Sequence, residues 1–174
     1  MRKASGKARA RWISRADWGA TEARQGAVPQ NPERIIIHHT ATPRASDYAG
    51  HETVLEIQRF HQNDRGWDDT AYHFVIAPDG AVYEGRPPRV EGAHVKNHNQ
   101  GSIGVALIGN FESGEDKIPT AAWRSLVKLV ELLCERFEIP RRSIHGHRDF
   151  NAATACPGDC LYSRLPDLRK AGGR

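Results

Sequence analysis

Two stretches of the chain combine a short, nearly continuous apolar run with many β-branched residues. Residues 34–38 read Arg-Ile-Ile-Ile-His, and residues 102–109 read Ser-Ile-Gly-Val-Ala-Leu-Ile-Gly. Short apolar runs bounded by turn-forming residues are typical of buried strands. We expect the first strand to deliver His38 at its end. The second is apolar toward both of its faces, which indicates a central position in a sheet.

A β-hairpin is predicted over residues 71–86. The segments Tyr-His-Phe-Val-Ile (72–76) and Ala-Val-Tyr-Glu (81–84) flank the tripeptide Pro78-Asp79-Gly80. Pro presets the backbone for a turn, Asp bonds to its own backbone, and Gly accepts a positive φ, so this tripeptide favours a turn. A further short strand is expected at residues 143–145.

Apolar residues at helical spacing predict two helices, over residues 51–62 and 120–137. The first carries Val54, Ile57 and His61 on one face. In the second, Thr120 is placed to cap the N-terminus. One apolar stripe is expected along that helix, made of Trp123, Val127, Val130, Cys134 and Phe137.

Strands and helices alternate along the chain, and neither an internal repeat nor a linker divides it. Pro140 ends the long helix, and residues 162–168 are expected to form a last helical turn. A length of 174 residues suits one domain with its own core. The pattern therefore predicts a single α/β domain over residues 12–174.

Composition and charge change this picture only at the N-terminus. Mean hydropathy is −0.63, and no apolar run approaches the roughly 18 residues that would span a bilayer, so we expect no transmembrane segment. Six basic residues and no acid fall within residues 1–16, and no apolar signal-peptide region precedes the domain. We expect residues 1–11 to form a basic arm. It is either a solvated tail or a segment attracted to a polyanion such as an anionic bacterial envelope or a nucleic acid.

The candidate chemistry lies in residues 143–158, where two histidines, a threonine and a cysteine share one short segment. Cys and neutral His are ligands that Zn²⁺ prefers, and a catalytic site takes three of them and leaves a position for water. One loop seldom supplies all three, so His38 or His39 is expected to contribute. Side chains alternate along a strand, so only one of this pair can enter the site. Spacing alone leaves His145 and His147 as alternatives.

Several motifs, in this order along residues 12–162, resemble the family of peptidoglycan recognition proteins and type 2 N-acetylmuramoyl-L-alanine amidases, which includes phage lysins. They are Ile-Ile-His-His-Thr-Ala (36–41), Gly-Trp (66–67), Tyr-His-Phe-Val-Ile-Ala-Pro-Asp-Gly (72–80), Gly-Ala-His (92–94), Asn99, Ser-Ile-Gly-Val-Ala-Leu-Ile-Gly-Asn-Phe (102–111), Gly-His-Arg-Asp (146–149) and Thr-Ala-Cys-Pro-Gly (154–158). The resemblance implies a central mixed β-sheet flanked by helices, with a substrate groove centred on zinc.

Carried over by position, the resemblance implies that the zinc ligands are His38, His147 and Cys156. The active-site tyrosine of the family falls on Tyr72, and the position two before the cysteine falls on Thr154. The chain departs from the family pattern in one place. His147 and Cys156 are nine residues apart where the pattern has eight, and the surplus lies in residues 151–154.

The activity implied is zinc-dependent hydrolysis of the amide between N-acetylmuramic acid and L-alanine in peptidoglycan. Tyr72 and Thr154 would donate to the oxyanion, or Tyr72 would orient the water. Packing of Tyr72 on the sheet and capping of a turn by Thr154 are the alternatives. By the same resemblance, binding of the muropeptide is assigned to His61, Trp67, Arg86, His94 and Asn99. The alternatives are ordinary loop polarity and, for Trp67, burial under the hairpin.

Two other classes of function are weighed against the amidase. A recognition module that binds peptidoglycan without cutting it typically lacks a zinc ligand, whereas this chain has all three. A nucleic-acid-binding protein with a structural zinc would need a fourth ligand and interleaved basic and aromatic residues, which are not visible. We therefore expect a monomeric, bacteriolytic amidase that acts on the cell wall, in the periplasm or outside the cell. A phage endolysin made in the host cytoplasm fits this expectation.

Three cysteines leave an odd count once one is assigned to the metal. Cys134 lies on the apolar stripe of its helix and is typical of a small buried hydrophobe. Cys160 would bridge to it if the last segment packs on that helix, so a free pair and a disulfide both stay open.

Overall fold

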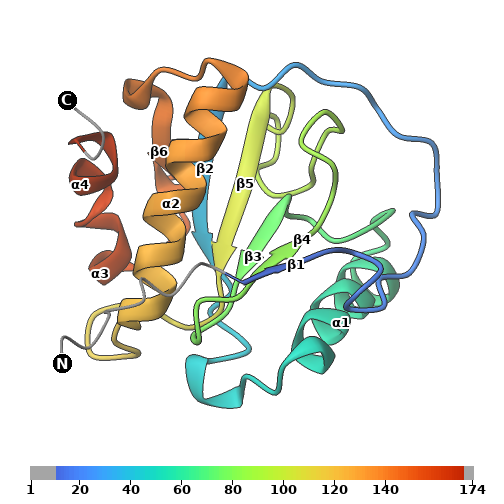
Figure 1. Cartoon of the computed structure of the whole chain (residues 1–174), viewed down its shortest axis with the longest axis horizontal. Coiled ribbons are helices and arrows are strands. Elements are labelled where there is room, and N and C mark those ends of the chain that lie inside the picture. Colours follow the sequence, from blue (N-terminus) through green and yellow to red (C-terminus); the bar gives the residue numbers. More distant parts are fainter. Residues whose placement is uncertain (1–10, 171–174) are drawn as a thin grey trace, which may run out of the picture.

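The computed structural model describes residues 11–170, which fold around a six-stranded mixed β-sheet with the order β1-β4-β3-β5-β2-β6 (Figure 1). The strands are β1 (Trp12–Ile13), β2 (Arg34–His39), β3 (Phe74–Ile76), β4 (Val82–Glu84), β5 (Ser102–Leu107) and β6 (Ile144–Gly146). Strand β5 pairs in parallel with both β2 and β3, so the predicted central strand is confirmed. The predicted hairpin is also confirmed, because β3 and β4 are antiparallel.

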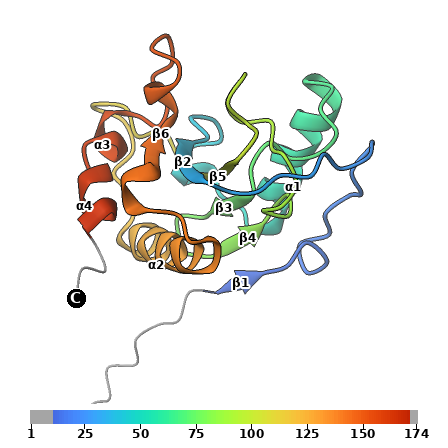
Figure 2. The same cartoon turned by 90° about the horizontal axis from the view of Figure 1, so that it is seen from above.

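Helices cover both faces of the sheet. They are α1 (His51–Arg59), α2 (Thr120–Phe137), α3 (Asp159–Tyr162) and α4 (Leu165–Lys170). Helices α2, α3 and α4 pack on one face, whereas α1 packs on the other with Val75 and Tyr83 of the hairpin (Figure 2). The helix predicted over residues 51–62 continues beyond Arg59 as a π-helical turn, Phe60–Asp64. The predicted single domain with a mixed sheet and flanking helices is confirmed.

The apolar stripe predicted for α2 is wrong by about one residue. The residues that α2 buries are Ala122, Ser125, Leu126, Leu129, Val130 and Leu133. The helix is apolar on two adjacent faces, and the face that carries these six residues is the one buried against the sheet. Trp123, Val127, Cys134 and Phe137 lie on the neighbouring face and are only partly buried, packed against this core. The predicted cap is wrong as well, since Pro119 holds the N-cap position and Thr120 is the first helical residue.

The sequence left open a disulfide between Cys134 and Cys160. Cys134, Cys156 and Cys160 are all free, so this disulfide does not form.

Most of the basic arm lies outside the described residues. Arg11 is described and forms an ion pair with Asp79 at 2.9 Å.

Across residues 11–170, no helix combines the length and the apolar character that crossing a membrane requires.

Candidate functional site

The end of β2 directs its two histidines to opposite faces of the sheet, as the alternation of a strand predicts. Both side chains are buried. His39 Nδ1 accepts a hydrogen bond from the backbone N–H of Phe111 at 3.2 Å, on the α2 side. His38 lies on the other side, where its ring is 5.3 Å from that of Tyr72. The lone pair of His39 Nδ1 is thus already used by the fold.

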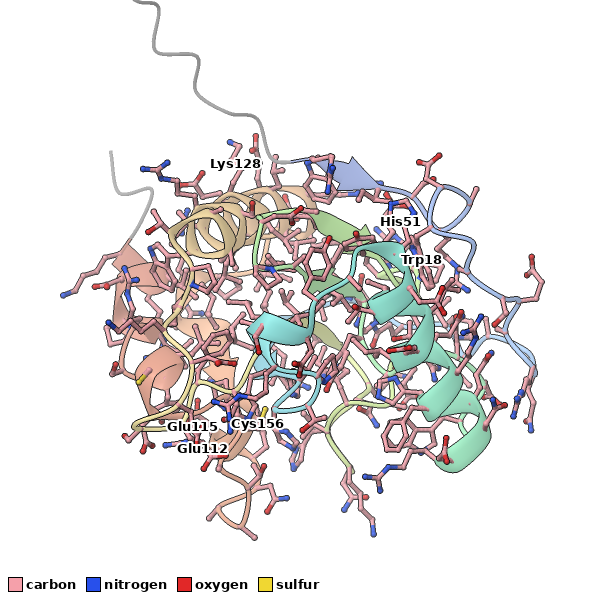
Figure 3. All side chains as sticks on the ribbon, turned by 90° about the horizontal axis from the view of Figure 1, so that it is seen from below. Trp18, His51, Glu112, Glu115, Lys128 and Cys156 are labelled. Carbon is pink, nitrogen blue, oxygen red and sulfur yellow. The ribbon has the colours of Figure 1, made fainter. Side chains whose placement is uncertain are left out.

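The loop after β6 brings His147 and Cys156 to the end of β2. Three possible metal-ligand atoms, one from each of His38, His147 and Cys156, all lie within 4.8 Å of one another. Cys156 Sγ is 3.5 Å from His38 Nδ1, and the rings of His38 and His147 are 4.8 Å apart. Figure 3 views the molecule from this end of the sheet, with Cys156 between α1 on one side and α3 and α4 on the other.

Arg148 closes this loop. Its backbone N–H donates to the carbonyl of Cys156 at 3.1 Å. Its guanidinium pairs with Asp159 at 2.7 Å and also donates to the carbonyl of Ala155. The loop turns at residues 151–154, where the N–H of Thr154 donates to the carbonyl of Asn151 at 3.2 Å. These hydrogen bonds tie the two ends of the loop together.

His145 lies outside this cluster. Its Nδ1 is 3.7 Å from an oxygen of Asp149, and its ring packs edge-on against Phe150. The spacing of the sequence could not separate His145 from His147. The structure separates them because β6 ends at Gly146 and the backbone turns into a short 3₁₀ helix, His147–Asp149.

Burial controls the charge of the three candidate ligands. It lowers the pKa of His38 well below its ordinary value and also lowers the pKa of His147. Burial raises the pKa of the Cys156 thiol to about 12. The imidazoles therefore keep free lone pairs, and a bound cation would favour loss of the thiol proton. Two neutral imidazoles and one thiol match the nitrogen and sulfur ligands that Zn²⁺ prefers, so the residues fit this metal.

Tyr72 and Thr154 occupy different positions around this cluster. Tyr72 is half-buried beside His38, and burial, followed by the proximity of Cys156, raises its pKa. It keeps its proton and can donate it. Thr154 Oγ1 accepts the backbone N–H of Cys156 at 3.2 Å, which caps the turn. Its hydroxyl proton is left for a second partner.

A cavity of about 500 Å³ opens over His38, Tyr72 and His147. Its other walls come from the loop after β2, from α1 with its π-helical turn, and from the loop after β4. The lining residues that the sequence did not indicate are Thr40, Thr42, Pro43, Glu56, Ile57, Phe60, Arg65, Ala71 and Ala93. The helical spacing of residues 56, 57, 60 and 61 could have shown that they share one face.

Two predicted substrate-binding residues, His61 and Trp67, line this cavity, with their rings 5.1 Å apart. His61 Nδ1 accepts the backbone N–H of Ala71 at 3.1 Å. Burial lowers the pKa of His61 to about 4. A neutral ring whose Nδ1 accepts must carry its proton on Nε2. His61 is thus a neutral side chain with one N–H to donate.

The other three predicted binding residues are placed differently. His94 lines the cavity, but both of its ring nitrogens bond within the protein. Asn99 is not among the lining residues, and its Oδ1 accepts the backbone N–H groups of His94 and Val95. Arg86 lines a second cavity of about 430 Å³, which shares Trp67 and Ala93 with the first. Its guanidinium donates to the carbonyls of Thr70 and Glu91.

Comparison with known proteins gives consistent matches. Residues 28–159 match the family described as N-acetylmuramoyl-L-alanine amidase. Peptidoglycan-recognition protein 1 of Holotrichia diomphalia is 36% identical over 157 residues, covering 88% of this chain and 78% of that protein. The N-acetylmuramoyl-L-alanine amidase of Sus scrofa is 37% identical over 159 residues, covering 87% of this chain but only 26% of that longer protein.

Solved structures give the same result. Drosophila PGRP-LB is 32% identical, with a TM-score of 0.80 over 89% of this chain and 92% of that one. Peptidoglycan recognition protein-LE in complex with tracheal cytotoxin, a monomeric diaminopimelic acid-type peptidoglycan, is 30% identical with the same TM-score, and covers 89% of this chain and 92% of that one.

Proposed function

Because this chain belongs to the N-acetylmuramoyl-L-alanine amidase family, we propose that it is a zinc-dependent amidase acting on bacterial peptidoglycan. The bond cut is the amide between N-acetylmuramic acid and L-alanine. The observation that carries this proposal is that ligand atoms of His38, His147 and Cys156 lie within 4.8 Å of one another. His38 and His147 also line the cavity of about 500 Å³ described above, which has an aromatic wall. A chain that only recognised peptidoglycan would have no need of a complete set of ligands.

His38 Nδ1, a ring nitrogen of His147 and Cys156 Sγ would hold the zinc. When bound, zinc supplies a Lewis acid and lowers the pKa of a coordinated water towards roughly 7. A catalytic zinc takes three protein ligands, so this set would leave the metal open to water and substrate from the cavity.

Tyr72 is the group best placed to stabilise negative charge on the scissile carbonyl. Its hydroxyl stays protonated because burial raises its pKa, and its ring lies 5.3 Å from that of His38. A donor aimed at the developing oxyanion acts most strongly in the transition state. Thr154 would add a second donor, since its oxygen lone pair is engaged by Cys156 N–H while its proton stays free.

The peptide stem and sugar would be bound along the cavity wall. His61 would donate its Nε2–H to a substrate carbonyl, and Trp67 would pack against the ligand. A ligand longer than the first cavity would cross Trp67 into the second, where Arg86 lies. The relative solved with tracheal cytotoxin supports a muropeptide as the ligand.

In the cell, the proposed hydrolysis would bring about cell-wall lysis of the endolysin type. The basic arm would raise the concentration of the enzyme at an anionic envelope, and the attraction would weaken with salt. The site of action would be the wall itself, in the periplasm or outside the cell.

The test is digestion of purified soluble muropeptides, with the products identified by mass spectrometry. We expect release of free stem peptides that begin with L-alanine, loss of the reaction with a chelator, and recovery after zinc is added back. Binding of muropeptides without release of the stem would replace the enzyme by a recognition module. Release that persists in metal-free protein would exclude the zinc mechanism.

A further inference from the structure

Three buried side chains form a continuous hydrogen-bonded row that starts at a candidate zinc ligand. His38 Nε2 is 2.9 Å from His94 Nδ1, and His94 Nε2 is 3.2 Å from Ser102 Oγ. Ser102 Oγ in turn lies 2.6 Å from the carbonyl oxygen of Asn99 and 3.0 Å from that of His98. The row runs from the end of β2 through the loop after β4 to the first residue of β5.

The far end of the row determines where every proton lies. A carbonyl oxygen only accepts, so the 2.6 Å contact with Asn99 uses the single proton of the Ser102 hydroxyl. Ser102 Oγ must then accept from His94 Nε2–H. A neutral imidazole that donates from Nε2 has its acceptor on Nδ1, the atom that lies 2.9 Å from His38 Nε2. His38 Nε2 must therefore carry a proton, which leaves the lone pair of its ring on Nδ1.

We infer that Ser102 and His94 are positioning residues that hold His38 in the Nε2-protonated tautomer, with its Nδ1 lone pair facing Cys156 Sγ before any metal arrives. The two atoms that would share the metal are 3.5 Å apart. The inference rests on the proposed zinc site and adds the groups that prepare one of its ligands. Outer partners of this kind fix both the tautomer and the ring plane of a metal-binding histidine.

The backbone around His94 supports this role. A Cβ added at Gly104 would lie 2.6 Å from His94 Cγ, and one added at Gly92 would lie 2.6 Å from His94 Cδ2. The ring therefore occupies space that only glycine leaves open on either side. Asn99 Oδ1 fixes the main chain at the same point by accepting from the N–H groups of His94 and Val95 at 2.8 and 2.7 Å.

This arrangement assigns His94 and Asn99 a different task from the one that resemblance implied. Both nitrogens of His94 and the amide oxygen of Asn99 are engaged inside the protein. A substrate that took a hydrogen bond from His94 would break the row. His94 contributes only its carbon edge to the cavity wall.

The first test reads the tautomer directly, in metal-free protein, from the ¹⁵N chemical shifts of the histidine rings at neutral pH. We expect His38 to be protonated on Nε2 in the natural chain. In Ser102→Ala and His94→Leu we expect a mixture of the two tautomers. His94→Asn should keep the natural tautomer more fully, because its amide oxygen replaces the Nδ1 acceptor. A natural chain with His38 protonated on Nδ1, or variants with an unchanged His38, would overturn the inference.

The second test measures the zinc dissociation constant by competition with a chelator. Loss of an outer partner typically weakens metal binding by about 10–100-fold, which is the effect expected for Ser102→Ala. Ser125→Ala is the matched control. Ser125 is also a buried serine whose hydroxyl donates to a backbone carbonyl, that of Gly80 at 2.6 Å, but it lies in α2. Both variants should lose similar stability, and only Ser102→Ala should lose zinc affinity.

The outcomes separate the two proposals. Equal zinc affinity in Ser102→Ala and Ser125→Ala, in a protein that binds zinc tightly, would refute the positioning role and leave the amidase proposal intact. A natural chain that binds no zinc would refute the amidase proposal, and the tautomer measurement would still decide the inference about Ser102 and His94.

Discussion

The two long helical segments pack on opposite faces of one sheet, but they bury different kinds of side chain. Of the six residues that α2 buries, Ser125 is the one with a polar side chain. The α1 segment and its π-helical turn also bury six residues, of which four are polar: Thr53, Gln58, His61 and Gln62. An apolar interface tolerates repacking, whereas a buried polar group is costly unless its partners are in place. We infer that the α2 face mainly stabilises the fold, and that the α1 face fixes the geometry of the site.

The largest effect that separates the two faces is expected from the adjacent histidines of β2. His38→Ala removes a proposed zinc ligand, so it should abolish measurable hydrolysis and lower the zinc content. His39→Ala removes the acceptor for Phe111 N–H on the α2 side and should cost about 1–3 kcal/mol of stability while zinc is retained. Metal analysis and chemical denaturation of both variants check this. Equal loss of zinc would show that the two sides are not distinct.

On the α2 face, Leu129→Ala should reduce stability without changing the chemistry. Leu129 is 1% exposed in the α2 core, and truncation of a buried leucine costs about 2–5 kcal/mol. Leu132→Ala is the control, because Leu132 lies on the same helix and is 37% exposed. Denaturant titration should separate the two variants, and kcat of the folded fraction should match the natural chain in both. A lower kcat in Leu129→Ala would mean that the α2 face also sets the site.

On the α1 face, Tyr72→Phe should lower kcat and leave the stability of the fold unchanged. Removal of one oxyanion donor costs about 10²–10³-fold in kcat, or about 2.7–4 kcal/mol. Zinc content and the unfolding free energy should barely change, since no hydrogen bond of the fold depends on this hydroxyl in the part of the chain that is described. Steady-state kinetics on soluble muropeptides provide the measurement. Near-natural kcat would return Tyr72 to a packing role.

A more gradual effect is expected from pH. Burial lowers the pKa of His61 and of His73 to about 4 in the folded protein, whereas a histidine in the unfolded chain takes up its proton near pH ~6.5. The unfolded state then binds more protons. Stability should be complete above pH ~6.5 and decline towards pH 4, by about 1.4 kcal/mol per pH unit for each neutral histidine.

Urea denaturation of metal-free protein between pH 7 and pH 4.5 measures this slope. His73→Gln should flatten it, because the variant removes one of the buried titrating groups. A stability that is independent of pH over this range would show that these histidines are not held neutral by burial.

Sequence alone could predict the parts of the molecule that depend on local pattern. The strand that delivers His38, the hairpin and the central strand follow from runs of apolar residues and from turn chemistry. The structure also brings His38, His147 and Cys156 together, as the carried-over motifs suggested. Coordination chemistry restricts a zinc site to a few residue types, so a motif that contains them is informative.

Other features depend on distant neighbours that no local pattern reveals. His94 and Asn99 have donors and acceptors that would suit a substrate, but Ser102 and nearby backbone groups already engage them. The face that α2 buries could not be chosen from spacing, since two adjacent stripes are apolar. Arg65 reaches the cavity wall at the end of the π-helical turn that continues α1, and this change of helical period has no clear sequence signal.

The most direct measurement of the central claim compares Cys156→Ala with Cys160→Ala. Both cysteines are free and lie four residues apart, but Cys156 is buried at the cluster and Cys160 is exposed on α3. Zinc per chain and stem-peptide release would be measured on the same preparations. The account predicts about one zinc per chain and full release for Cys160→Ala, and neither for a folded Cys156→Ala. A Cys156→Ala protein that still released stem peptides would contradict it.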